Sequence, residues 1–227
     1  MSVGRRQLLR WHVWLGWLIG VPLVLWTVSG LVMVVRPIEE VRGTDIRADL
    51  PPLAPLAVVV PDFEPGSLVA LSLRQTPLGP RWIATGTDEQ RFAADPRTGL
   101  RLPALSRRQA EAAALAYRKG PARVASASFT PAARPPLDLR QPRPAWGVRF
   151  SDGARFYIDA QTGELLAVRT GFWRFYDVMW GLHIMDPRGR EDTHHPILIG
   201  FSVLAAIGAV LGCVLMGVRY WPRRRPG

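Results

Sequence analysis

The chain has 227 residues, 48% of them apolar, and its mean hydropathy of +0.06 is that of an ordinary soluble protein. A net charge of +11 often indicates a nucleic-acid partner. Here, however, several arginines flank apolar runs and the others are scattered among prolines, so no nucleic acid is expected. The single cysteine, Cys213, excludes a disulfide within the chain, and the lack of a C-x-x-C-H motif excludes covalently attached c-type haem. Non-covalent binding of haem is not excluded by this observation.

The apolar residues are concentrated in two runs that contain no Lys, Arg, Asp or Glu, at residues 11–35 and 196–218. A helix rises about 1.5 Å per residue, so about 20 residues cross the apolar core of a bilayer. Both runs are therefore predicted to be transmembrane helices in contact with the lipid bilayer. The first run is longer than the roughly 7–15 apolar residues of a signal peptide, so we expect an uncleaved signal-anchor.

The charges beside the two runs predict how the chain is oriented. Basic residues flank both runs: Arg5, Arg6, Arg10, Arg219, and Arg223 to Arg225. Positive residues in short flanks stay on the cytoplasmic side. Residues 1–10 and 219–227 are accordingly predicted to be cytoplasmic, and the segment between the spans to be periplasmic, in a bacterial inner membrane.

The segment after the first span changes twice in its composition and in its pattern of apolar residues. Residues 36–65 are predicted to be an exit segment and a proline-rich extended linker. Alternating patterns then predict strands in a β-rich first half-repeat at residues 66–105. The pattern R-F-x-x-D-x-x-T-G-x-x-L occurs at residues 91–102 and again at 155–166. Each copy predicts a β-hairpin, because Asp can bond backbone amides ahead of it and Gly takes the positive-φ position.

The stretch between the two copies predicts a helix. It covers residues 106–119, with Ser106 as its N-cap and Gly120 and Pro121 as its end. Strands are predicted at residues 123–129 and 145–150. The predicted fold class is therefore a membrane protein in which two transmembrane helices flank an α+β domain of helices and small antiparallel sheets.

An aromatic-rich segment precedes the second span. Its apolar residues recur at helical spacing: Phe172, Phe175, Met179, Leu182 and Met185. Such a helix suits the membrane interface, but it also suits the core of the domain. Residues 171–195 are predicted to be an interfacial aromatic helix and a histidine-containing loop, with a core helix as the alternative.

These segments together resemble the PepSY-associated transmembrane family. The resemblance rests on H-x-x-x-G and T-x-S-G motifs in the first span, on residues 106–170, which resemble a PepSY module, and on W-x-L-H at residues 180–183. Larger members with four spans resemble ferric-siderophore reductases that carry b-type haem, and others are associated with iron uptake. The PepSY module alone is linked to peptidase inhibition in some secreted proteins. With two spans this chain resembles half of a larger member, which makes a homodimer attractive.

All the histidines lie in or beside the predicted membrane segments: His12, His183, His194 and His195. Helical spacing places His12 roughly on one face with several later residues of the span: Gly16, Gly20, Leu23, Thr27 and Gly30. Small residues beside a histidine let a flat macrocycle lie against the backbone, but they also let two helices pack closely. Haem ligation, helix packing and interfacial anchoring are therefore all open for His12.

His183, His194 and His195 could converge at the opposite mouth of the bilayer. Two imidazoles can hold a haem iron. Imidazoles and carboxylates together suit zinc, copper or iron, and the carboxylates here are Asp186, Glu191 and Asp192. A polar collar at the membrane surface is the third interpretation. His195 would share a small and weakly polar helix face with Ser202, Ala206, Ala209 and Cys213.

The distance between the two histidine sites limits what one chain can do. His12 and His195 should lie about 25–30 Å apart, at opposite bilayer faces, so they cannot hold one haem within a monomer. A homodimer forming a four-helix bundle would pair His12 with its copy. A Gly-x-x-x-Gly motif at Gly208 and Gly212 modestly favours such a dimer.

No G-x-S-x-G, H-E-x-x-H or phosphate-loop motif is present, and no catalytic residue is predicted. The first hypothesis is an inner-membrane redox protein that binds haem b and passes electrons to a periplasmic acceptor such as a ferric siderophore. It would act as a reductase or as an electron-transfer subunit. The second is a non-enzymatic, membrane-anchored PepSY module that binds a peptide or protein. The third is a periplasmic metal-binding accessory using His183, Asp186, His194 and His195.

Overall fold

The structure, a computed structural model, describes residues 3–220. Residues 1–2 and the arginines at 223–225 lie outside this range, so the predicted basic tail is largely outside the described residues. The described chain forms two compact units. We call residues up to Arg36 and from Phe175 the helical unit, and residues from Pro37 to Arg174 the central domain.

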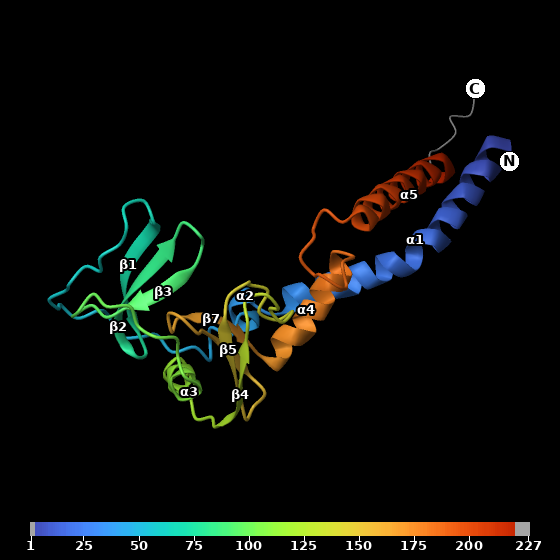
Figure 1. The fold of residues 1–227 in the computed structure, drawn as a ribbon. Coiled ribbons are helices and arrows are strands. Elements are labelled where there is room, and N and C mark those ends of the chain that lie inside the picture. The colour runs from blue at the N-terminus through green and yellow to red at the C-terminus, as the bar shows by residue number, and fades with distance from the viewer. Residues whose placement is uncertain (1–2, 221–227) are drawn as a thin grey trace. The chain divides into compact units, whose positions relative to one another are not determined.

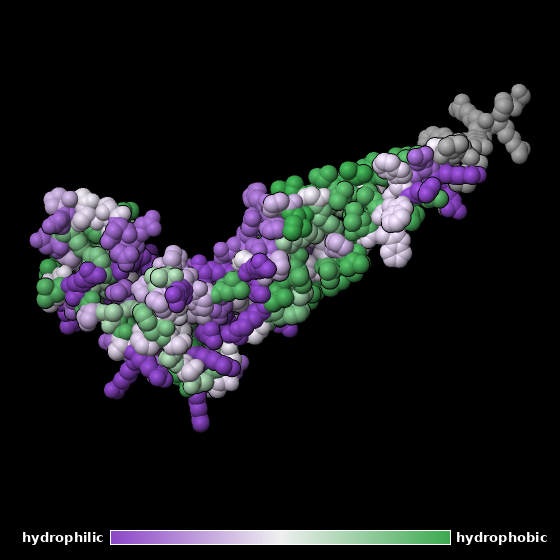
Figure 2. Space-filling model, turned by 45° about the vertical axis from the view of Figure 1, so that its right-hand side comes forward, coloured by the Kyte–Doolittle hydropathy of each residue, from purple (hydrophilic) through white to green (hydrophobic). Residues whose placement is uncertain are grey.

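Two long helices dominate the helical unit, α1 (Val3–Val35) and α5 (Pro196–Tyr220). Each has an apolar stretch long enough to cross a membrane, Arg6–Val35 and Pro196–Arg219. Their apolar side chains face outward, and Trp17, for example, is 80% exposed. Figure 2 shows this as hydrophobic surface along both helices. The predicted pair of membrane helices flanking a region of antiparallel sheet is confirmed.

The two long helices pack against each other in antiparallel fashion (Figure 1). A Cβ built on Gly208 would lie 3.0 Å from Ile19 Cδ1, and one built on Gly212 would lie 3.1 Å from His12 Cε1. The Gly-x-x-x-Gly motif of α5 is therefore occupied by α1 of the same chain. Since small residues act by letting a neighbouring helix approach, this motif no longer argues for a dimer.

The aromatic segment forms helix α4 (Gly171–His183), and the boundary between the two units falls within it. The predicted helical face was wrong at its end, because Met185 has a φ of 57° and lies beyond the helix. The chain closes there with two hydrogen bonds, from the Asp186 amide to the Gly181 carbonyl (2.9 Å) and from the Met185 amide to the Leu182 carbonyl (3.2 Å). This pairing is a Schellman motif, which ends a helix by turning one residue into the left-handed region.

The central domain contains two antiparallel sheets. The first has the order β1-β2-β3, with bounds Leu68–Thr76, Gly79–Gly86 and Arg91–Ala94. The second has the order β4-β5-β6-β7, with bounds Val124–Thr130, Ala145–Phe150, Arg155–Asp159 and Leu165–Arg169. A four-residue helix, α2 (Ile38–Val41), precedes them. The strands predicted within these ranges are therefore confirmed.

Helix α3 (Arg107–Ala116) packs its buried alanines on the second sheet. Ser106 caps it as predicted: its side chain accepts from the Gln109 amide, and the Gln109 side chain bonds back to the Ser106 amide. The helix ends three residues before the predicted residue 119. The reason is competition for the backbone, because the Lys119 amide donates to the Ile46 carbonyl (2.9 Å).

The two copies of the repeated pattern form the same turn. Asp95 Oδ1 accepts from the amide of Arg97 (2.7 Å), and Asp159 Oδ1 accepts from that of Gln161 (2.8 Å). The glycine of each copy, at positions 99 and 163, has a positive φ, 73° and 79°. Only the second copy is a full hairpin. The first continues into a single bridge between residues 94 and 101, because Pro103 follows and has no amide to extend the ladder.

The proline-rich segment before β1 has no regular structure, as predicted, but it is not a free spacer. The Val59 amide donates to the Pro96 carbonyl (2.8 Å), and Trp82 Nε1 donates to the Val59 carbonyl (2.9 Å). Phe63 also packs on Phe92, with ring centroids 5.7 Å apart. The segment is therefore tied to the first sheet by its own backbone.

Candidate functional site

A groove lies between α1 and α5 in the helical unit, with a volume of about 510 Å³. It is lined by nine residues, which we call the His12 groove: His12, Gly16, Ile19, Gly20 and Leu23 of α1, and Ala205, Ala206, Gly208 and Ala209 of α5. Cβ atoms added to Gly16 and Gly20 would meet nothing within 4 Å. The two glycines therefore leave room that larger side chains would fill.

His12 has an unusual hydrogen-bonding state within this groove. Its Nδ1 atom is buried and has no hydrogen-bond partner among residues 3–220. A buried polar atom without a partner typically costs about 1–3 kcal/mol, so such atoms are few in native proteins and call for an explanation. Because Nδ1 is enclosed, the other ring nitrogen, Nε2, is the one that a group in the groove can reach.

His183, the last residue of α4, packs on the opposite end of α1. Its ring stacks on Trp26 with centroids 4.8 Å apart and an interplanar angle of 12°. Its Nδ1 atom lies 3.1 Å from the Trp26 carbonyl oxygen and 3.1 Å from the Ser29 Oγ atom. Ser29 is 1% exposed, and its hydroxyl donates to the same Trp26 carbonyl (2.9 Å).

These contacts assign the tautomer of His183. A carbonyl oxygen only accepts hydrogen bonds, so the Nδ1 atom beside Trp26 must carry the proton. The Ser29 hydroxyl has already given its one proton to that carbonyl, so its oxygen accepts from His183 too. The lone pair of a neutral His183 is then on Nε2, for which no hydrogen bond is found within residues 3–220.

The other two histidines cap and border the start of α5. His195 Nδ1 accepts from the Ile197 amide at 3.4 Å, which makes this ring an N-cap of the helix. His194 is exposed, and its Nδ1 atom lies 3.4 Å from Thr193 Oγ1. Among residues 3–220 no three His, Cys, Asp or Glu side chains lie close enough to hold a metal ion. The described residues therefore contain no three-ligand metal site here, and the use of His183 together with His194 or His195 stays a prediction.

Asp186, considered above as a metal ligand, instead organises the loop between α4 and α5. Its Oδ1 atom accepts from the Gly189 amide (2.9 Å), and its Oδ2 atom accepts from the amides of Glu191 (3.2 Å) and Asp192 (3.3 Å). Hydrogen bonds from these amides, above all that of Gly189, lower the pKa of Asp186. The carboxylate is thus engaged by the backbone on both oxygens.

The structure brings together some of the predicted site residues and separates others. His12, Gly16, Gly20 and Leu23 do line one groove. Ala206 and Ala209, expected on the face of His195, lie in that same groove. Ser29 lies 17 positions after His12 in α1, a separation of about 25 Å along the axis. The His12 groove and the surroundings of His183 are therefore separate places in the helical unit.

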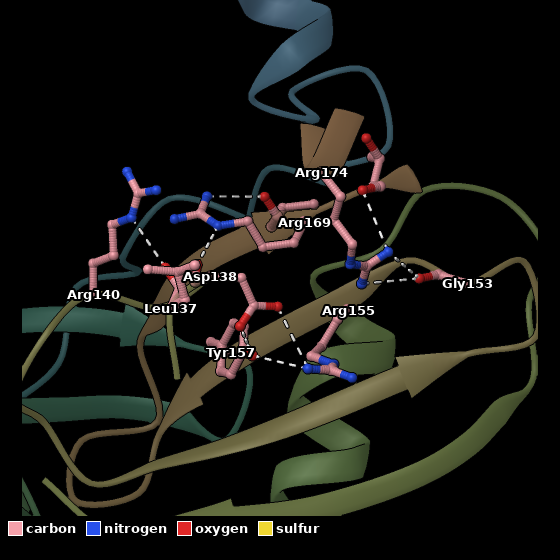
Figure 3. Close-up of polar contacts among 10 residues, drawn as sticks. Leu137, Asp138, Arg140, Gly153, Arg155, Tyr157, Arg169 and Arg174 are labelled. Carbon is pink, nitrogen blue, oxygen red and sulfur yellow. Dashed lines mark hydrogen bonds and ion pairs between the residues drawn. The ribbon is translucent and has the colours of Figure 1, made fainter. Parts of the chain in front are cut away.

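The central domain has a polar cluster of a different kind, on strands β6 and β7 (Figure 3). Tyr157 donates to Asp138 Oδ1 at 2.6 Å, and Arg155 reaches both the tyrosine oxygen (3.1 Å) and Asp138 Oδ2 (3.4 Å). Burial, and then Asp138, raises the pKa of Tyr157 to about 12. Arg169 donates to the Asp138 carbonyl and stacks on Trp173 at 4.1 Å. This cluster joins the strands to the preceding loop.

Two apolar helices of membrane-spanning length around a domain with antiparallel sheets define a membrane protein with two candidate spans. The family model described as the PepSY-associated TM region matches residues 9–227, and the chain belongs to that family. The resemblance found in the sequence is thereby confirmed. Neither the curated proteins nor the solved structures gave a match.

Proposed function

We propose that this protein is an inner-membrane redox protein that binds haem b in the His12 groove and passes electrons to a periplasmic acceptor. The observation that carries the proposal is a groove of about 510 Å³ lined by His12, whose Nδ1 atom is enclosed and whose Nε2 atom is left as the nitrogen that a ligand can reach. Ligand sites of this kind are mostly apolar with a few placed polar groups, and their volumes are about 300–1,000 Å³. Haem b, when bound, supplies a centre that accepts and donates single electrons.

The chemistry of the groove fits such a group. Gly16 and Gly20 leave the backbone of α1 open over one helical turn, so a flat, apolar macrocycle can lie against it. His12 supplies the one imidazole of the groove. A second imidazole to hold the group would come from His12 of another copy, because Ser29, which contacts His183, lies about 25 Å along α1 from His12. A homodimer with a four-helix bundle is therefore part of the proposal.

His183 supports a second cofactor site at the other end of the helices. Histidines that ligate a metal usually donate their other ring N–H to a backbone carbonyl or a carboxylate, which fixes the ring and raises its basicity. His183 donates in this way to the Trp26 carbonyl. Its Nε2 atom is therefore oriented to act as a ligand, and His194 or His195 in the adjoining loop would supply the second imidazole.

The orientation of the protein belongs to the same proposal. Arg6 and Arg10 begin α1, and Arg219 lies in the last turn of α5. The antiparallel packing of the helices brings these basic residues to one end of the pair. Following the positive-inside rule, both termini are cytoplasmic and the central domain is periplasmic. The central domain would then dock the electron acceptor, for which the family resemblance suggests a ferric siderophore.

The test is a spectrum of the full-length protein purified from haem-replete membranes. We expect a reduced-minus-oxidised α-band characteristic of bis-histidine b haem in the wild type. His12→Ala should remove one spectral component, His183→Ala a different one, and Lys119→Ala, a change in the central domain, should remove none. A wild-type protein without a haem absorption band would contradict the proposal. Loss of the same component in both histidine variants contradicts the two separate sites.

A further inference from the structure

Arg81 of strand β2 is buried in the central domain, with only 8% of its surface exposed. Its Nη1 atom lies 3.8 Å from the position of a Cβ on Gly163, beside the turn of the second repeat, where Leu78 and Leu105 also pack. Both Nε and Nη1 are fully enclosed and have no hydrogen-bond partner among residues 3–220. The second terminal nitrogen, Nη2, is not enclosed in this way.

No carboxylate among residues 3–220 forms an ion pair with Arg81. Glu164 pairs with Arg91 at 2.6 Å and with Arg74 at 3.4 Å. Asp95 attracts Arg81 electrostatically but forms no ion pair with it within 4.0 Å. Burial lowers the pKa of Arg81, and Asp95 offsets this in part. Because a guanidinium stays protonated in proteins, the site retains a buried positive charge without a direct partner.

Arg81 also lines a cavity of about 450 Å³. The cavity lies between the proline-rich segment, the start of β2 and the turn of the first repeat. The apolar residues on its walls include Pro55, Leu56, Leu78 and Leu102, and its charged residues are Arg81, Asp95 and Arg97. Since Nε and Nη1 are enclosed, Nη2 is the donor that a ligand in this cavity can reach.

We propose that this cavity binds an organic carboxylate with a compact apolar body. The carboxylate accepts from Nη2 of Arg81, and the apolar body packs on the proline and leucine walls. A singly charged anion fits better than a dianion, because the two positive charges of Arg81 and Arg97 and the one negative charge of Asp95 give the cavity lining a net charge of +1. Arginine and carboxylate form one of the strongest charge-assisted hydrogen bonds in proteins. A free organic acid and the C-terminus of a peptide share this chemistry.

The experiment measures binding to the full-length protein in a non-ionic detergent by isothermal titration calorimetry. Benzoate represents a free acid, and acetyl-leucine represents a peptide C-terminus. Benzamide and acetyl-leucinamide are their uncharged counterparts, and inorganic phosphate is the dianion. Arg81→Met removes the charge while keeping an extended side chain. Arg149→Met is the matched control, because Arg149 is an exposed arginine on strand β5.

We expect saturable binding of at least one of the two acids to the wild type and to Arg149→Met. The matching amide, and Arg81→Met with the acid, should each bind at least tenfold more weakly. Binding of benzoate alone assigns a free acid, and binding of acetyl-leucine alone assigns a peptide end. The comparison of acid with amide needs only the wild type, so it holds even if Arg81→Met fails to fold. Equal binding of acid and amide, no saturable binding of either acid, or tighter binding of phosphate overturns the proposal.

Discussion

At one end of the α1–α5 pair a histidine has a buried ring nitrogen without a partner, and at the other end a histidine has that nitrogen bonded twice. His12 faces a groove of small residues. His183 is stacked on Trp26 and bonded to a carbonyl and a hydroxyl. The protein therefore fixes the second ring by its own groups. The Nδ1 atom of the first ring has no hydrogen-bond partner among residues 3–220, and an unpaired buried polar group is destabilising.

The largest expected effect comes from filling the His12 groove, which tests whether this groove holds the cofactor. Gly16→Leu combined with Gly20→Leu should reduce the haem content of the purified protein at least tenfold, because two leucine side chains would occupy the free space beside α1. Haem per protein is measured by the pyridine haemochrome assay. Gly200→Leu, at another open glycine of the membrane helices, should leave the haem content unchanged. An undiminished haem content in the double variant would place the cofactor elsewhere.

A second change tests the orientation of His183. Ser29→Ala removes one of the two partners of His183 Nδ1 while the Trp26 carbonyl stays. Loss of an outer partner of a ligating histidine typically costs about 10–100-fold in metal affinity. We expect about a tenfold loss at the His183 site, with a shifted redox potential of the haem that stays bound.

The matched control for this change is Thr27→Val. The Thr27 hydroxyl donates only to the Leu23 carbonyl one turn earlier in the same helix. The redox potential of the haem is measured by potentiometric titration of the wild type and the two variants. If Thr27→Val and Ser29→Ala behave alike, the Ser29 hydroxyl does not position His183.

The smallest expected effect lies in the central domain. The hydroxyl of Tyr157 has hydrogen-bond partners, and it can be compared with the Nδ1 atom of His12, which has none among residues 3–220. Tyr157→Phe removes the hydrogen bond to Asp138 and should lower the free energy of unfolding by about 1 kcal/mol at neutral pH. The folded-state pKa of about 12 exceeds the ordinary value of about 10. The extra stability of the neutral tyrosine is therefore present below pH 10 and lost as the pH rises towards 12.

Urea unfolding of the wild type and Tyr157→Phe across this pH range makes the comparison. The difference in unfolding free energy between the two proteins should shrink as the pH rises from 10 to 12. A difference that stays constant would mean that Tyr157 titrates normally in the folded protein.

The membrane helices could be predicted because apolar length is a local property of the sequence. So could the cap at Ser106 and the two Asp-to-Gly turns, where the interacting residues lie within a few positions of each other. The end of α3 was misplaced because its backbone competes with residue Ile46, some 70 positions earlier. Contacts of this kind leave no trace in local periodicity.

The candidate site was predictable in part for the same reason. Helical spacing placed Gly16 and Gly20 beside His12, and they line one groove with it. Spacing did not reveal which helix would cover the glycines of α5, and the answer is α1 rather than a second copy. The roles of Ser29 and Trp26 were missed because they join α1 to His183, a contact that spans 154 positions. The T-x-S-G motif was the one available signal.

The contact between Gly30 and His183 has a further consequence. A Cβ on residue 30 would lie 3.1 Å from His183 Cε1, tighter than ordinary van der Waals contact allows. Residue 30 is therefore sterically restricted: the volume of its side chain, rather than its polarity, decides whether the imidazole of His183 can lie flat on Trp26. In a saturation library at this position, tolerance should fall as side-chain volume rises, and even alanine requires the imidazole to shift by a few tenths of an ångström.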